Sequence, residues 1–380
     1  MYGNELNNYS YLRISEGNIT LFDDLNFELW LNKLPIVGLI LLYMVVGCVG
    51  NVLVIYIYTI SMKMKKVNRF FIPYLAIVDI LSLVFNGSFE IVFAHYQLNF
   101  DNDVGCKFIR FLGNVFVILS GILLLMIAVQ RYVLVCKPLS NVFTAKKKQY
   151  VLVSVVAFTL ILSSPKFVFT GIMEIDTMYT NVTGLVCGIK EEFAGSLPLL
   201  VYNIILILTG FSAIVTLAVL YSFVVKAIRA RNNKLMGLRG APRKTDITES
   251  SITTDPSDSR KVSIVTLPSS RNQSIVSMSN NNSITRSEKI RNLGANSRFS
   301  RMFFIITVLC FATYAPRMAL ENIEASNKNY QKDFSLQKRV LIGFLESFYL
   351  FNSVVNPFVY GIFDQDFRKR LKDIFLAFRS

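Results

Sequence analysis

Six polar side chains stand inside long apolar stretches of this sequence, where a polar group is costly and is a candidate for function by default. They are one carboxylate, two hydroxyls and three amides: Asp79, Ser120, Ser353, Asn51, Asn352 and Asn356. A carboxylate surrounded by hydroxyl and amide oxygens suits a small hard cation such as sodium. It suits equally a structural network of hydrogen bonds without an ion. We expect these side chains to form one cluster, and both alternatives stay open.

Catalytic chemistry has little support in the same residues. The chain has one histidine, which argues against a histidine-based metal centre or catalytic triad. Five cysteines are too few for a small disulfide scaffold. We find no phosphate-binding loop, no nucleophile elbow and no metal-ligand spacing. The sequence therefore predicts a protein that is not an enzyme and has no cofactor other than the sodium candidate.

The elements that position the polar cluster are long apolar segments. The composition is 53% hydrophobic and only 17% charged, with a mean hydropathy of +0.46. Segments of roughly 20 apolar residues can cross the hydrocarbon core of a membrane as helices. We predict seven such spans, which are 35–60, 70–93, 108–135, 150–173, 197–227, 302–323 and 340–363. The predicted fold is an all-α membrane protein, a seven-transmembrane helix bundle with a short amphipathic helix after the seventh span.

Lysine and arginine in the connections predict the orientation in the membrane. The odd-numbered connections are basic, which places the carboxyl terminus in the cytoplasm and the amino terminus outside, at the plasma membrane. The net charge of +15 is therefore assigned to a membrane surface rather than to nucleic acid. Glycosylation sequons at Asn8, Asn18 and Asn181 fall on predicted outside segments.

The chain divides into five parts. These are an extracellular segment 1–34, transmembrane helices 35–231, a cytoplasmic loop 232–297, transmembrane helices 298–363 and an amphipathic membrane-surface helix 364–380. The loop has no aromatic residue and nineteen serines or threonines, so we expect it to be disordered. Basic residues before its serines make it a candidate site for kinases and arrestin. The terminal helix alternates phenylalanine with lysine and arginine, which is typical of a helix lying on membrane lipid.

Five short motifs occur in the right order on the predicted spans. They are GN at 50–51, LAIVD at 75–79, QRY at 130–132, YAPR at 314–317 and NPFVY at 356–360. With these motifs the chain resembles the rhodopsin-like, class A G-protein-coupled receptors over all seven spans. The resemblance implies two partners, namely an extracellular peptide ligand, in the manner of neuropeptide receptors, and a heterotrimeric G protein.

The resemblance also implies roles for individual residues. Cys106 and Cys187 would form the family disulfide. Arg131 would contact the G protein when the bundle opens, and Pro316 would kink a sixth helix that swings outward. The other residues implied in coupling and activation are Tyr132, Tyr221, Tyr314, Asn356, Pro357 and Tyr360.

Several positions depart from the family pattern. Gln130 stands where an acid usually restrains the arginine, so we expect raised basal activity unless other contacts compensate. Tyr314 replaces the usual tryptophan of the sixth helix. The fourth span lacks its usual tryptophan, and the fifth has Ala213 near its usual proline. These departures leave the expected fold intact.

The outer third of the bundle is the expected ligand site. The candidate lining residues are Glu90, Gly113, Asn114, Tyr202, Asn203, Tyr314, Arg317, Glu321, Glu346 and Tyr349. Gly113 stands where amine receptors have aspartate, and Leu350 where opsins hold retinal through lysine. Charges of both signs favour a short neuropeptide. The alternative is that Arg317 forms an internal salt bridge with Glu346 or Glu90 that ligands never touch.

The sequence thus predicts a receptor that binds an extracellular ligand and activates a G protein by outward movement of its sixth helix. A receptor for a non-amine small molecule, such as a melatonin-like ligand, remains open, as does an atypical receptor that does not couple. A transporter is disfavoured because the sequence shows no paired repeats.

Overall fold

Backbone polar groups in hydrocarbon must be satisfied within their own segment, and the apolar segments accordingly form helices. The computed structural model describes residues 19–61, 69–137, 144–176, 183–240, 301–323 and 336–377. Its long helices are α1 (Ile19–Tyr56), α2 (Phe71–His95), α3 (Asp103–Cys136), α4 (Ala145–Ser163) and α6 (Leu197–Gly240), followed by the helix Arg301–Ile323. Shorter elements are η2 (Ile57–Ser61), α5 (Lys166–Phe169), α8 (Leu336–Ser347), η4 (Phe348–Leu350), α9 (Phe351–Phe363) and α10 (Gln365–Ala377).

Six described helices are long and apolar enough to cross a membrane. The seventh predicted span forms α8, η4 and α9, in which a 3-10 turn at Phe348–Leu350 separates two shorter helices. The bundle exposes large apolar side chains on its outside, Phe211 and Ile161 among them, and buries polar groups such as Asp79 inside. This inside-out arrangement suits a helix bundle surrounded by lipid, and the predicted fold class is confirmed.

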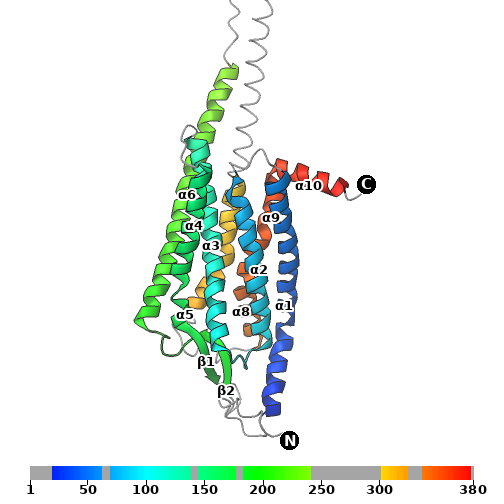
Figure 1. Cartoon of the computed structure of the whole chain (residues 1–380), viewed down its shortest axis with the longest axis vertical. Coiled ribbons are helices and arrows are strands. Elements are labelled where there is room, and N and C mark those ends of the chain that lie inside the picture. Colours follow the sequence, from blue (N-terminus) through cyan, green and yellow to red (C-terminus); the bar gives the residue numbers. More distant parts are fainter. Residues whose placement is uncertain are drawn as a thin grey trace, which may run out of the picture.

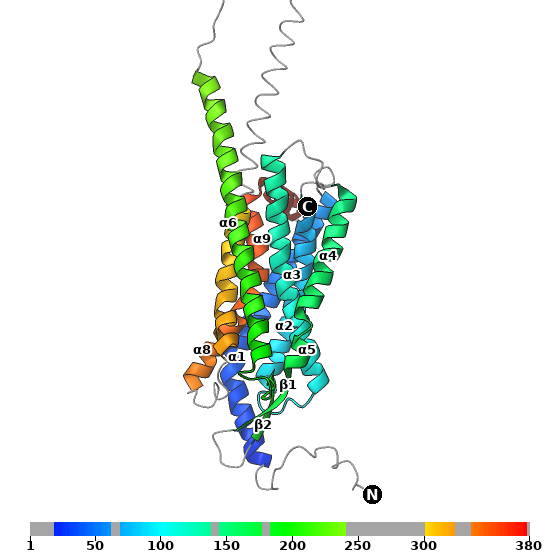
Figure 2. The same cartoon turned by 90° about the vertical axis from the view of Figure 1, so that its left-hand side faces the viewer.

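The bundle has two distinguishable ends (Figure 1). The hairpin end carries the strands β1 (Thr170–Asp176) and β2 (Thr183–Ile189) and the start of α1. The α10 end carries α10, which turns away from the bundle axis. At this end α6 extends beyond its neighbours in both views (Figure 2).

The helices α1 and α6 are longer than the predicted spans. The helix α1 begins at Ile19, well before residue 35, and its extension is attached to the end of α2. There Trp30 packs edge-on against His95 with ring centroids 5.0 Å apart, and Asn26 Nδ2 donates to the His95 carbonyl at 3.1 Å. With 44 residues, α6 measures about 65 Å at 1.5 Å per residue. It continues to Gly240, past the predicted boundary at 231.

The hairpin of β1 and β2 was not foreseen, and it corrects the predicted fourth span. That span was expected to reach residue 173, but α4 ends at Ser163 and residues from Thr170 onward form β1. Strand β1 pairs antiparallel with β2, which places Ile172 opposite Cys187. Cys187 forms a disulfide with Cys106 at the start of α3, as predicted, with the two Cα atoms 5.5 Å apart. The cross-link holds the hairpin over this end of the bundle.

The amphipathic helix expected after the seventh span is α10. Phe367 is buried against the bundle, whereas Phe375 and Leu376 on α10 are exposed. Several other predictions lie outside the described residues, namely the sequons at Asn8, Asn18 and Asn181 and the cytoplasmic loop from residue 241 with its candidate phosphorylation sites.

Candidate functional site

The predicted polar cluster forms in the middle of the bundle, around a fully buried carboxylate. Asp79 of α2 is 0% exposed. It accepts hydrogen bonds from Ser353 Oγ at 3.0 Å and from Asn356 Nδ2 at 2.7 Å, both on α9. Asn352 of α9 also donates to Ser120 Oγ of α3 at 3.4 Å. The cluster thus connects three helices that are distant in sequence.

Close packing of α1 on α9 brings the last cluster member into place. A Cβ atom on Gly50 would lie 2.9 Å from the Pro357 side chain, which is closer than real Cβ contacts come. Because Gly50 has no side chain, α1 packs closely on α9, and the neighbouring Asn51 comes within hydrogen-bond distance of α9. Asn51 Nδ2 donates to the Ser353 carbonyl at 2.8 Å. The GN motif of α1 and the NP motif of α9 therefore belong to the same contact between these helices.

The donor set of this cluster fits a small cation. The side-chain oxygens of Asn51, Asn352 and Asn356 are buried, and no described residue supplies them with a hydrogen-bond partner. Buried polar atoms without partners are costly, and amide and carboxylate oxygens are ligands for hard cations. Asp79, Ser120, Asn352 and Ser353 are the residues that would hold sodium. An ion there would balance the buried charge of Asp79.

At the α10 end, the arginine of the QRY motif is covered by another helix. Arg131 is only 5% exposed, and its guanidinium carbon lies 5.3 Å from the ring centroid of Phe303, on the helix Arg301–Ile323. Gln130 beside it is also buried. A partner approaching from this end would reach Arg131 only after the helix Arg301–Ile323 moved away.

The tyrosines implied in activation pack against aromatic rings of the bundle. Tyr360 is buried, and its ring packs at 6.2 Å from that of Phe303. Tyr221 packs at 5.7 Å from the Phe304 ring, and Tyr132 at 6.0 Å from Phe223 of α6. Further along, Tyr314 lies 6.0 Å from Tyr349 by ring centroids. Pro316 lies within the helix Arg301–Ile323.

Sequence reasoning missed a buried ionic junction at the α10 end. Asp364 connects α9 to α10 and is 1% exposed by side chain. It accepts a hydrogen bond from Tyr58 Oη of η2 at 2.6 Å and pairs with an Arg69 guanidinium nitrogen at 3.2 Å. Its other oxygen accepts from the backbone N–H groups of Asp366 and Phe367 and so caps α10. An acid immediately before an amphipathic helix was the available indication.

At the hairpin end, the candidate Arg317 is held inside the protein. Its Nη1 lies 2.8 Å from Glu90 Oε1 of α2, and its Nε lies 3.2 Å from Glu321 Oε1. Its guanidinium stacks over the Tyr349 ring at 4.6 Å, and Nη1 also donates to the Glu346 carbonyl at 3.2 Å. The internal Arg317–Glu90 salt bridge considered as an alternative is therefore present.

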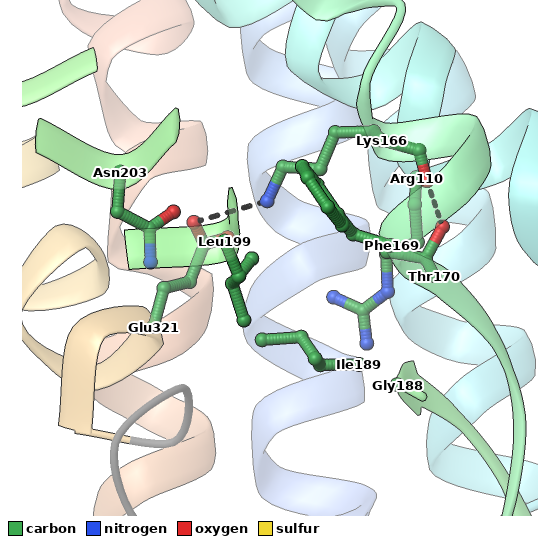
Figure 3. Close-up of a pocket in the computed structure, with 9 residues that line it drawn as sticks. All are labelled: Arg110, Lys166, Phe169, Thr170, Gly188, Ile189, Leu199, Asn203 and Glu321. Carbon is green, nitrogen blue, oxygen red and sulfur yellow. Dashed lines mark hydrogen bonds and ion pairs between the residues drawn. The ribbon is translucent and has the colours of Figure 1, made fainter. Parts of the chain in front are cut away.

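A pocket lies beside this network, beneath the hairpin (Figure 3). The pocket is partly open to solvent. Of the predicted ligand residues, Glu321 and Asn203 line it. The remaining lining residues were missed, and they are Arg110, Lys166, Phe169, Thr170, Gly188, Ile189 and Leu199. Arg110 was identifiable in principle, because it stands one helical turn after Cys106 and so faces the tethered hairpin.

Three other predicted lining residues form contacts between helices of the bundle. Asn114 Nδ2 lies 3.3 Å from Tyr202 Oη and 3.1 Å from Ser163 Oγ, so these side chains join α3, α4 and α6. A Cβ atom on Gly113 would lie 2.8 Å from Asn86 Oδ1 of α2. Gly113 therefore serves the close contact between α2 and α3.

The motifs and the bundle agree with a known family. The model of the seven-transmembrane receptors of the rhodopsin family matches residues 50–360. The chain belongs to this family. Among solved structures, this receptor is similar to squid rhodopsin with a TM-score of 0.64, over 93% of the chain and 86% of that protein, at 14% identity. Similarity at that identity shows the shared fold.

Curated relatives of this receptor include receptors named for peptides and a rhodopsin. It is 29% identical to the tachykinin-like peptides receptor 86C of Drosophila melanogaster, over 49% of the chain and 38% of the relative. It is 25% identical to the substance-K receptor of Homo sapiens, over 54% of the chain and 50% of the relative. It is also 25% identical to a GQ-coupled rhodopsin of Mizuhopecten yessoensis, over 56% of the chain and 41% of the relative. The matches span half or less of each relative. Family membership makes the chain a multi-pass membrane receptor, not an enzyme.

Proposed function

We propose that this receptor binds an extracellular ligand, most simply a short peptide, at the hairpin end, and activates a heterotrimeric G protein at the α10 end. Activation requires outward movement of the helix Arg301–Ile323. The receptor stands in the plasma membrane with its hairpin end outside and its α10 end in the cytoplasm. The basic connections of the sequence support this orientation.

The covered position of Arg131 carries the proposal. Its guanidinium lies under Phe303 and is 5% exposed, so it is inaccessible to a partner while the helix Arg301–Ile323 stays in place. Displacing that helix exposes a buried cation and its apolar surroundings together. A ligand that favours the displaced arrangement shifts the population toward it, which links an event at one end of the bundle to a binding surface at the other.

A peptide ligand is favoured over retinal and over amines. Two of the relatives are named as receptors for tachykinin-like peptides or substance K. The rhodopsin relative raises the question of retinal, but Leu350 stands where opsins carry the retinal-binding lysine, and it is buried at 1% exposure. Gly113 stands where amine receptors carry an aspartate, and it is closely packed against Asn86.

Nucleotide exchange by purified G proteins tests the coupling step. The full chain in nanodiscs would be compared with Arg131→Ala at equal receptor concentration, using Gs, Gi and Gq heterotrimers separately. We expect exchange in the parent without ligand, and its loss in Arg131→Ala. Paired spin labels at the α10 ends of α3 and of the helix Arg301–Ile323 should report a longer distance when nucleotide-free G protein is bound.

The neutral residue before the arginine is tested in the same assay. We expect Gln130→Asp to lower exchange without ligand, because an acid restrains the neighbouring arginine, whereas Gln130→Leu should not lower it. Exchange that is unchanged by Arg131→Ala would contradict the coupling proposal. Failure of every G-protein class to respond to the parent, with no change in spin-label distance, would favour the non-coupling alternative.

We also propose that the polar cluster around Asp79 binds sodium. The unpartnered amide oxygens of Asn352 and Asn356 and the buried carboxylate support this. Sodium chloride should raise the unfolding temperature of the purified receptor relative to choline chloride at equal ionic strength. Asp79→Asn should remove that difference while keeping the size of the side chain. An equal effect of the two salts on the parent would leave the cluster as a hydrogen-bond network.

Contacts with membrane lipid through α10 and with kinases and arrestin through the cytoplasmic loop complete the proposal. The exposed Phe375 and Leu376, next to basic residues of α10, support lipid contact.

A further inference from the structure

The pocket beneath the hairpin contains more positive than negative side chains. Arg110 and Lys166 are its cations, and Glu321 is the one acid among its lining residues. We propose that the ligand of this receptor carries a carboxylate that binds between Arg110 and Lys166, next to an apolar group of the ligand. This inference rests on the proposed receptor function and names the chemical class of its ligand.

Arg110 is held in position by two contacts that carry no negative charge. One of its terminal nitrogens donates to the Cys187 carbonyl at 2.8 Å, and its guanidinium lies over the Phe93 ring at 5.4 Å. These contacts fix the direction of the side chain into the pocket, as Figure 3 shows. Its Nε is buried, and neither a hydrogen-bond acceptor for it nor a carboxylate at ion-pair distance occurs in the part of the chain that the structure describes.

Such an arginine is suited to an incoming carboxylate. A guanidinium presents five N–H donors in a planar fork, and carboxylates match that fork with two parallel hydrogen bonds. A buried donor without an acceptor is costly, so a ligand that supplies the acceptor gains affinity. The backbone of the disulfide-linked hairpin holds Arg110 in place before the ligand arrives, which lowers the ordering cost of binding.

The acid of the pocket does not cancel its two cations. Glu321 Oε1 is engaged by Arg317 at 3.2 Å. Its Oε2 lies 3.7 Å from Lys166 Nζ, which is beyond hydrogen-bond distance. The charge of Glu321 is therefore shared by Lys166 and Arg317 and, more weakly, by Arg110. Lys166 makes no hydrogen bond to Glu321 and retains donors for a second anion. Figure 3 shows the Lys166 amine directed toward Glu321.

A basic ligand group is disfavoured by the same geometry. Glu90 already receives Arg317 Nη1 at 2.8 Å and Tyr349 Oη at 3.3 Å, and Glu321 is occupied by the two cations named above. A ligand amine would have to displace an internal partner. Arg317, the arginine that sequence reasoning placed in the ligand site, is for its part satisfied within the protein.

The apolar part of the lining defines the rest of the ligand group. Phe169, Ile189 and Leu199 line the same pocket as the charged residues. A carboxylate beside an aromatic or aliphatic side chain fits this combination. The carboxylate comes either from a free peptide carboxyl terminus or from an acidic side chain next to an apolar residue.

Small matched probes test the charge requirement directly. N-acetylphenylalanine and N-acetylphenylalaninamide differ in one carboxylate, and each would be titrated against the purified full chain in nanodiscs while the unfolding temperature is recorded. We expect the acid to bind about tenfold or more tightly than the amide, as is typical of hydrogen bonds to charged groups. N-acetylglutamyl-phenylalaninamide and its glutaminyl analogue form the second pair and distinguish the side-chain source from the terminal one.

Three variants test whether Arg110 causes the preference for the acid over the amide. Arg110→Gln should abolish the preference for the acid. Glu321→Gln should strengthen it, because Lys166 is then released from its partner. Lys107→Gln is the matched control, since Lys107 lies on the same helix, pairs with Asp103 outside the pocket, and carries the same charge as Arg110. It should leave the preference unchanged.

The inference is overturned if the acids give no greater shift than the amides at millimolar concentration, or if the preference survives Arg110→Gln. Because unfolding is recorded without G protein, failure of the coupling assay leaves this result intact. Conversely, a neutral peptide that activates the parent and Arg110→Gln equally would support the proposed receptor function and contradict the proposed ligand carboxylate.

Discussion

The buried junction around Asp364 predicts that one carboxylate holds α10 against the bundle. The perturbation is Asp364→Ala. It removes the acceptor for Tyr58 Oη at 2.6 Å, the ion pair to Arg69 at 3.2 Å, and the cap on two N–H groups at the start of α10. The side chains of Arg69 and Asp364 are 6% and 1% exposed, so solvent cannot replace what is lost.

The expected magnitude follows from this burial. Removing one partner of a buried ion pair costs about 3–5 kcal/mol, and the lost cap and hydroxyl contact overlap with that figure rather than adding to it. Asp364→Asn keeps the size and an amide oxygen for capping but loses the charge, so its effect should be smaller. Asp373→Ala is the matched control on α10, because its side chain is 52% exposed and its ion pair with Arg370 is long at 3.9 Å. An exposed pair contributes below about 1 kcal/mol.

Amide hydrogen exchange in α10 is the appropriate assay, because it reports local opening rather than global unfolding. We expect exchange in residues 365–377 to accelerate about a hundredfold or more in Asp364→Ala, since each 1.4 kcal/mol is a factor of ten. Tyr58→Phe removes a hydrogen bond to the same carboxylate. The double variant should therefore lose less free energy than the sum of the two single variants. Exchange in Asp364→Ala that matches Asp373→Ala would refute the reasoning, and so would strict additivity with Tyr58→Phe.

Two further predictions concern the bundle itself. Cys106→Ser opens a cross-link between residues 81 positions apart, which should lower the free energy of unfolding by about 4–5 kcal/mol. The number of receptors at the cell surface should fall sharply. The control is Cys48→Ser, which replaces a free cysteine. Gly50→Ala would press a methyl group against Pro357 at 2.9 Å and should cost about 1–3 kcal/mol. Gly38→Ala on the same helix meets nothing within 4 Å, so its unfolding temperature should equal or exceed that of the parent; equal losses in the two variants would contradict the packing argument.

Local patterns were sufficient to predict the helices and the central cluster. A segment that is apolar over membrane thickness has one stable form whatever its neighbours are, because its backbone must bond internally. A carboxylate or amide side chain within such a segment is costly in contact with lipid, and Asp79 and Asn356 do meet Ser353 in the interior. The disulfide of Cys106 and Cys187 came from resemblance to the family, not from the pattern itself.

Predictions failed where the outcome depends on contacts between distant segments. The fourth span was extended into β1 because residues 170–173 are apolar enough for a helix, whereas pairing with β2 makes them a strand. The Asp364 junction was missed because its partners Tyr58 and Arg69 are some 300 positions away in sequence. Nothing local marks an acid at a helix start as buried.

The sequence by itself determined that this chain is a membrane bundle with a polar centre, since hydrophobic length and the cost of buried polarity are properties of single segments. Only the tertiary structure decided how the charges pair. Arg317 and Glu90 are 227 positions apart and neutralise one another, whereas Arg110 faces the pocket with no described acid at ion-pair distance. Electrostatic interactions depend on separation in space and on burial, and no spacing along the chain specifies either.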